Sequence, residues 1–139
     1  LVIAILSIVT MVFIRPFSQF QKEQILHKET DGVVSVLEEA RSKTLASINN
    51  TFYGVHFATT SVVLFQGAVF SSETVGNETH SFDALVTMKA PMLQGGGSDV
   101  VFKKRTGETD FYGTITLQIA GSLSSSTISI LRTGLIEVI

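Results

Sequence analysis

The chain has 139 residues, a formal net charge of −2 and no cysteine. The lack of cysteine excludes disulfides, thiolate chemistry and sulfur-ligated metals, and the small net charge gives no overall attraction to nucleic acid or anionic lipid. The length allows one modest globular domain with an elongated appendage.

The N-terminal segment is strongly apolar. Residues 1–14 carry no charge and only two hydroxyls, those of Ser7 and Thr10. As a helix rising about 1.5 Å per residue, this segment would cover roughly 21 Å of a hydrocarbon core about 30 Å thick. We therefore expect further apolar residues before Leu1 and interpret the chain as a fragment or a processed product. A cleaved secretory signal is the alternative, but no small-residue cleavage site follows Ile14, which favours a retained anchor.

A helical pattern continues from this segment to about Ile48. Glu39 precedes Lys43 by four residues, the favourable order for an ion pair on a helix. Gly32 is a weak point of the helix, and Asn49 and Asn50 are suited to end it. One apolar stripe of an amphipathic helix is formed by Leu26, Val33, Leu37, Ala40, Thr44 and Ile48.

Proline and phenylalanine mark the junction between the apolar and the polar part of this helix. Pro16 removes one backbone hydrogen bond and predicts a kink or an unwound stretch nearby. Phe13, Phe17 and Phe20 follow at spacings of four and three, so their rings share one face. Two interpretations stay open: anchoring at the membrane interface or ordinary packing, and a contact stripe for neighbouring copies of the helix.

After Asn50 the pattern changes to alternation and β-branched residues, which predicts strands. We expect strands at residues 53–57, 61–65, 82–88, 100–103, 113–119, 127–131 and 135–138. Arg132-Thr133-Gly134 predicts a tight turn that joins the last two strands as a hairpin. The predicted fold is α+β, with a long hydrophobic-then-amphipathic N-terminal helix packed on an antiparallel β-sheet head. It divides into a hydrophobic segment (1–20), an amphipathic spine helix (21–49) and a β-rich globular head (50–139).

The sequence holds no catalytic or metal-binding pattern, and we expect neither enzymatic activity nor a cofactor. The histidines His27, His56 and His80 share no ligand-like spacing, and we expect His56 to be exposed on its strand. We expect three acids in loops, Asp99, Glu108 and Asp110. They lack the spacing of a calcium site, and we expect them to be solvated. The one basic run, Lys103-Lys104-Arg105, is expected to be a solvated hairpin end.

A family resemblance is carried by the string Leu1-Val2-Ile3-Ala4-Ile5-Leu6-Ser7-Ile8-Val9. It resembles the hydrophobic core of the N-terminal segment shared by type IV pilins and type II secretion pseudopilins. In that family the segment follows a short basic leader, a mature end that opens with Phe or Met, and a glutamate. The methylation site and the assembly glutamate are therefore assigned to no residue of this chain. The head resembles minor pseudopilin H and FimT-like proteins through Glu39-Ala40-Arg41-Ser42, Val100-Val101-Phe102, Thr106-Gly107-Glu108 and Thr133-Gly134-Leu135-Ile136-Glu137-Val138.

The resemblance implies a structural subunit, pilin or minor pseudopilin, of a type IV pilus-like or type II secretion filament. Such a subunit crosses the cytoplasmic membrane once before it polymerises, through its N-terminal helix, into an extracellular or periplasmic filament. The expected partners are copies of itself or related pilins, the membrane, and a pilus or secretion assembly platform; nucleic acid is not expected. The residues expected to serve membrane insertion and assembly are Leu1, Ile5, Leu6, Val9, Phe13, Pro16, Phe17 and Phe20.

Two other functions remain open. The first is a membrane-anchored binding module whose head captures DNA or a secreted protein. The second is a secreted β-domain with an uncleaved signal.

Overall fold

A computed structural model describes the backbone of residues 1–139 and the side chains of residues 1–12 and 16–139. One helix, α1 (Val2–Leu45), accounts for 44 residues and includes Pro16. The unwound stretch expected near Pro16 is not found in the described backbone. A proline removes only one N–H donor, and the turns on either side carry the helix past it.

The predicted helix end near Ile48 lies three residues beyond the observed one. Ser47 adopts a left-handed conformation with φ of 52°, and a short 3₁₀ helix, η1 (Ile48–Asn50), follows. Asn49 and Asn50 also have positive φ. The asparagines therefore take the conformation expected of them, but the chain has already left the helix.

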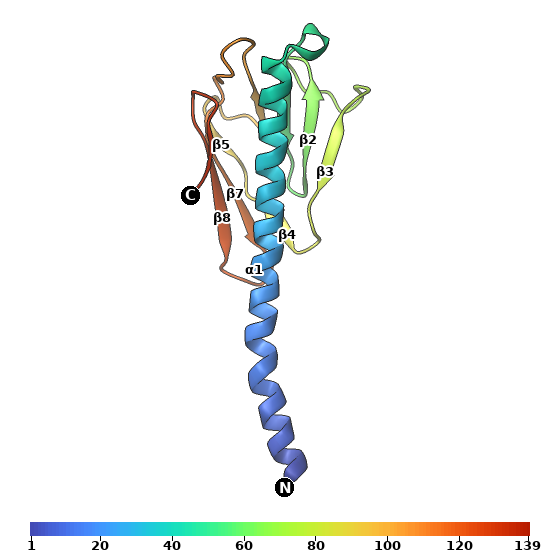
Figure 1. The fold of residues 1–139 in the computed structure, drawn as a ribbon, viewed down its shortest axis with the longest axis vertical. Helices are drawn as coiled ribbons and strands as arrows, with labels where there is room; N and C mark the ends of the chain where they lie inside the picture. The colour runs from blue at the N-terminus through green and yellow to red at the C-terminus, as the bar shows by residue number, and fades with distance from the viewer.

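The two halves of α1 have different surroundings (Figure 1). The N-terminal half projects beyond the head, whereas the C-terminal half lies against it. One side of the C-terminal half is buried, through Leu26, Glu29, Thr30, Val33, Leu37, Ala40 and Thr44. The helix passes Gly32 without a break, and the missing side chain makes room for the His80 ring, whose Nε2 would lie 2.7 Å from a Cβ at Gly32.

Two antiparallel sheets form the head. The first has the order β3-β2-β1-β6 and is built from β1 (Tyr53–Phe57), β2 (Ser61–Gln66), β3 (Glu78–Ser81) and β6 (Asp99–Val101). The second has the order β4-β7-β8-β9 and is built from β4 (Val86–Met88), β7 (Gly113–Ile119), β8 (Ser125–Ile130) and β9 (Ile136–Val138). A two-residue strand, β5 (Met92–Leu93), also pairs with β7. The predicted α+β fold, with a long N-terminal helix packed on antiparallel sheets, is confirmed.

The core lies between α1 and both sheets. Val55, Phe57 and Leu64 reach it from the first sheet, and Ile115 and Ile128 from the second. Along β7 the buried side chains alternate with partly exposed threonine and glutamine, as the sequence pattern indicated.

The predicted strands match the bounds of β1 and β7, lie within one or two residues of the bounds of β2, β6, β8 and β9, and differ more at β4. Only Val86–Met88 of the predicted strand 82–88 is extended, because Asp83 forms a turn in which its carboxylate accepts the N–H of Leu85 at 3.0 Å. The strands β3 and β5 were missed. Glu78–Ser81 is polar and β5 has two residues, so neither offers an apolar alternation. The last two strands do pair as a hairpin, and Gly134 in its turn has φ of 86°.

Candidate membrane and assembly surface

Residues 1–12, at the start of α1, are apolar, and none of their side chains is buried. Leu1, Ile5 and Leu6 are 101%, 56% and 59% exposed, and Val9 is 45% exposed. The positions between them are equally bare, since large exposed fractions also occur at Val2, Ile3, Ile8, Met11 and Val12. A helix that is hydrophobic on every side is typical of a membrane span or of the interior of a helix bundle.

The two hydroxyls of this segment are satisfied within the helix. Ser7 Oγ donates to the carbonyl of Ile3 at 2.8 Å, and Thr10 Oγ1 donates to the carbonyl of Leu6 at 2.9 Å. Neither hydroxyl needs water or another chain as a partner, so they raise little barrier to burial in lipid. Within α1 an 18-residue window has a mean hydropathy of 1.8 and none of it is buried. The helix is thus long and apolar enough for membrane insertion, a property that it shares with secretion signals.

Two phenylalanines of the candidate surface come shortly after the apolar residues 1–14 in the sequence. Phe17 and Phe20 are 62% and 58% exposed. Phe13, the third residue of the expected stripe, lies outside the residues whose side chains the structure describes. Both interpretations of the stripe stay open, because an exposed ring suits a membrane interface as well as a neighbouring helix.

The C-terminal half of α1 is fixed to the first sheet by a buried carboxylate. Glu29 is only 4% exposed. Its Oε2 lies 3.1 Å from Nε2 of His80 on β3, and its Oε1 accepts the N–H of Asp83 at 3.2 Å. Both carboxylate oxygens therefore have partners, as a buried carboxylate requires. These contacts tie the helix to the chain on either side of Phe82.

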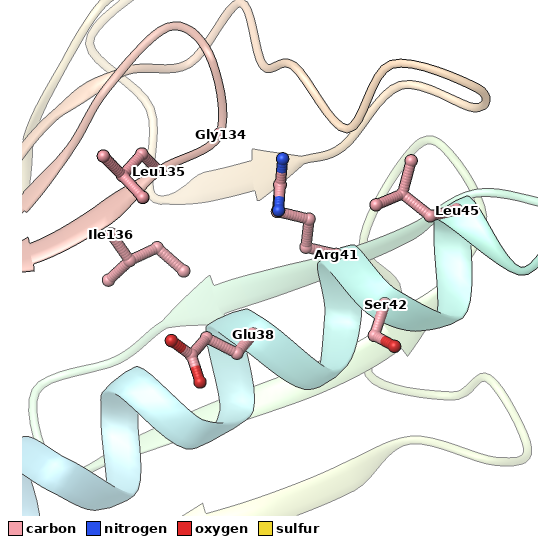
Figure 2. Close-up of a pocket in the computed structure, with 7 residues that line it drawn as sticks. All are labelled: Glu38, Arg41, Ser42, Leu45, Gly134, Leu135 and Ile136. Atoms are coloured by element: carbon pink, nitrogen blue, oxygen red, sulfur yellow. The ribbon is translucent and has the colours of Figure 1, made fainter.

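Arg41 fastens the same helix to two turns near its C-terminal end. Its Nε donates to the carbonyl of Gly107 at 3.2 Å. A Cβ at Gly134 would lie 1.9 Å from that carbonyl oxygen and 2.8 Å from Arg41 Nε, so only glycine fits there. Figure 2 shows Arg41 reaching from α1 toward the turn that holds Gly134. An open cavity of about 300 Å³ lies beside it, lined by Glu38, Arg41, Ser42, Leu45, Gly134, Leu135 and Ile136. It is a joint between helix and turn rather than an enclosed ligand site.

The structure corrects the expectation for His56. The side chain is half-buried rather than exposed: Nδ1 contacts the carboxylate of Asp99 on β6, and the ring stacks on Phe70 with centroids 4.0 Å apart. The sequence pattern placed His56 correctly on the face opposite Val55 and Phe57. It could not show that the loop between β2 and β3 would fold Phe70 over that face.

Of the three acids expected in loops, Asp99 lies on β6 instead, whereas Glu108 and Asp110 are exposed as expected. Asp99 faces His56, and Asp110 forms an ion pair with Lys103 at 2.8 Å. Lys104 donates to Asn50 and lies over the Phe52 ring, 5.1 Å from its centroid. Across the part of the chain that the structure describes, no group of three histidines or acids is placed to hold a metal ion.

In the contact between α1 and the head, Glu29 is the residue that the sequence pattern missed. In the apolar stripe, Val33 follows Leu26 at a spacing of seven residues, which is about two turns of helix. Glu29 and Thr30 fill this gap on the buried side. A charged residue inside the gap of an otherwise regular stripe was the available signal for a buried polar contact.

Comparison with known proteins gives no family assignment, since no family model, no curated protein and no solved structure matches the chain. The architecture itself, a long apolar N-terminal helix packed on antiparallel sheets, is consistent with a pilin-like fold.

Proposed function

We propose that the protein is a structural subunit of a type IV pilus-like or type II secretion filament. The observation that carries this proposal is the contrast within α1, one continuous helix whose first part is apolar and bare while its second part is built into the head. A binding domain needs only a tether, whereas a filament subunit needs a long apolar helix held rigidly by its head. The sequence resemblance to pilins supports the same class.

The proposed mechanism is an exchange of surroundings for the apolar helix. The subunit first rests in the cytoplasmic membrane with residues 1–20 in lipid and the head outside. Assembly then moves this segment into a bundle of identical or related helices, with help from an assembly platform. Because lipid and a helix bundle are similarly apolar, the exchange is close to balanced and little apolar surface meets water. The heads form the outer shell of an extracellular or periplasmic filament.

The charge substitution Ile5→Asp tests this proposal. A charged residue at the centre of a membrane helix costs about 2.5 to 3.5 kcal/mol, so the equilibrium constant for membrane insertion should fall by about 100-fold. Filaments should disappear with it. Membrane fractionation and electron microscopy measure the two effects. Val75→Asp is the matched control, because Val75 is an equally apolar residue, 95% exposed, in a head loop.

A normal yield of filaments from Ile5→Asp would contradict the proposal. So would a free β head released by ordinary signal peptidase.

Phe17→Ala separates the two interpretations of the aromatic stripe. If Phe17 contacts a neighbouring helix, the variant should insert into membranes normally but form fewer or shorter filaments. If it serves only the membrane interface, assembly should be unchanged. Filament length by electron microscopy, normalised to the inserted subunit, gives the answer, and Phe20→Ala repeats the test one turn further along.

The binding-module alternative is tested with the full chain in lipid nanodiscs. Binding through phosphate contacts weakens as the salt concentration rises, so a titration with DNA over a salt series would detect it. We expect no such salt-dependent binding. Tight, salt-dependent binding in the absence of any filament would favour the alternative.

A further inference from the structure

The turn between β7 and β8 presents the most exposed large apolar side chain of the described head. Leu123, at the apex of this turn, is 103% exposed. The serines on either side of it are bonded to each other: Ser122 Oγ donates to Ser124 Oγ at 3.2 Å, and the N–H of Ser124 donates to Ser122 Oγ at 3.1 Å. The turn is therefore held in shape by its own hydrogen bonds, and these leave Leu123 pointing away from the protein.

This turn lies at the end of the head that faces the apolar half of α1 (Figure 1). Ser124 and Ser125 share a small cavity with Glu23 and Leu26 of the helix. At about 1.5 Å of rise per residue, Glu23 is only about 4.5 Å further along the axis than Phe20, the last ring of the apolar segment. Beyond each side of the hydrocarbon core a bilayer has an interfacial layer roughly 5 to 8 Å thick. The apex of the turn thus lies at the height of that layer when residues 1–20 are in lipid.

The composition of the hairpin suits such a position. Residues 111–131, which contain β7, the turn and β8, include no lysine, arginine, histidine or acid. Bringing this hairpin against a lipid surface therefore requires no charged group of the hairpin itself to lose water, and the nearest charge beside the turn is that of Glu23 on the helix. Val69 and Val75, which are also strongly exposed, lie in the loop between β2 and β3 at the opposite end of the head, whereas the exposed Ile139 lines the same cavity as Ser124 and Ser125.

We propose that the β7–β8 turn is a second membrane contact, in which Leu123 enters the interfacial layer of the bilayer that holds α1. The inference rests on the proposed membrane insertion and concerns the subunit before assembly. A single helix sets the height of the head above the membrane but leaves the head free to tilt and to rotate about the helix axis. The second contact fixes which side of the head faces the lipid. The head is then presented to its neighbours in one orientation.

Tryptophan fluorescence suits a test on the full chain, because the protein contains no tryptophan. The variants Leu123→Trp, Val75→Trp and Ile5→Trp are reconstituted separately in phosphatidylcholine vesicles whose acyl chains are brominated near the headgroup. We expect blue-shifted emission and strong bromine quenching for Leu123→Trp, and water-like, unquenched emission for Val75→Trp. Ile5→Trp reports whether the helix itself is embedded.

A second pair of variants removes the preference of tryptophan itself for the interface. Ser125→Trp is compared with the double variant Ser125→Trp/Leu123→Ser. Burial of a leucine side chain corresponds to a factor of about 10 or more in an equilibrium, so the lipid-contacting population should fall by about that factor when Leu123 is lost.

The outcomes are distinct. If Leu123→Trp is not quenched while Ile5→Trp is embedded, the second contact is wrong and the anchor stands. If neither is quenched, the proposed membrane insertion falls and the inference falls with it. A third outcome is a blue shift of Leu123→Trp that increases with the protein-to-lipid ratio but is not accompanied by bromine quenching. It would assign Leu123 to a contact with a second copy and would also overturn the inference.

Discussion

The two halves of α1 have the same secondary structure but opposite relations to the rest of the molecule. In the C-terminal half, Val33, Leu37 and Ala40 are fully buried on one side of the helix. In the N-terminal half, the described apolar side chains have no buried side at all. The C-terminal half belongs to the head as a core element, whereas the N-terminal half must find its apolar surroundings outside the chain. Helix formation is therefore shared between the halves, and the difference in function lies in what each half packs against.

The strongest test of this difference between the two halves of α1 is to truncate one leucine in each half. Leu37→Ala should destabilise the head by about 2 to 5 kcal/mol, because it leaves a cavity in a fully buried site. Leu6→Ala, in the bare half, should leave the stability of the head unchanged. Urea unfolding in mild detergent, followed by the fluorescence of Tyr53 and Tyr112, measures both. Equal effects of the two substitutions would show that the halves are not independent.

Local patterns predicted the elements whose residues alternate or repeat regularly. The strand β7 has Ile115, Leu117 and Ile119 on its buried side, so its bounds followed from the sequence alone. The helical stripe was equally clear. Pairing between strands distant in the chain, and the polar edge strand β3, gave no such signal, because their positions depend on contacts that form only in the folded head.

The contacts that join the helix to the head could not be predicted for the same reason. His80 is separated from Glu29 by 51 residues, and Gly107 from Arg41 by 66 residues. No local periodicity relates residues so far apart. The Arg41 motif was recognised through the family resemblance, but its partners, the turns at Gly107 and Gly134, came only from the structure.

The buried carboxylate sharpens the comparison, because it tests whether polar contacts also hold the C-terminal half. Glu29→Ala leaves the N–H of Asp83 without its acceptor and should cost about 1 to 3 kcal/mol of head stability. Glu29→Gln should cost less, since its amide oxygen can still accept that N–H. The same urea unfolding measures both variants.

Glu38→Gln is the matched control, because Glu38 is exposed on the same helix. It should change stability by no more than about 0.5 kcal/mol. If Glu29→Ala is as stable as the native chain, the Glu29 contacts add nothing to the hold of this half of the helix on the head.

The smallest expected effect comes from the outer face of the C-terminal half. Lys43 lies 2.8 Å from Glu39, which confirms the predicted pair, and 3.2 Å from Glu78 on β3. The hydrogen bond to Glu39 raises the pKa of Lys43 above its ordinary value of 10.5, with Glu78 contributing in the same direction. Because the folded-state pKa is higher than the unfolded one, this stabilisation is complete below the ordinary value. It is lost as the pH rises through the folded-state value.

The size of this pH-dependent loss is about 0.5 kcal/mol or less, since the pair lies at the surface. Lys43→Arg is the informative comparison, because a guanidinium keeps its charge throughout the range. The stability of the native chain relative to Lys43→Arg should stay constant between pH 7 and about pH 10 and fall above about pH 10.5. A stability difference that stays flat through this range would mean that the charge of Lys43 adds nothing to the hold of α1 on the head, which then rests on burial, the Glu29 contacts and the Arg41 hydrogen bond.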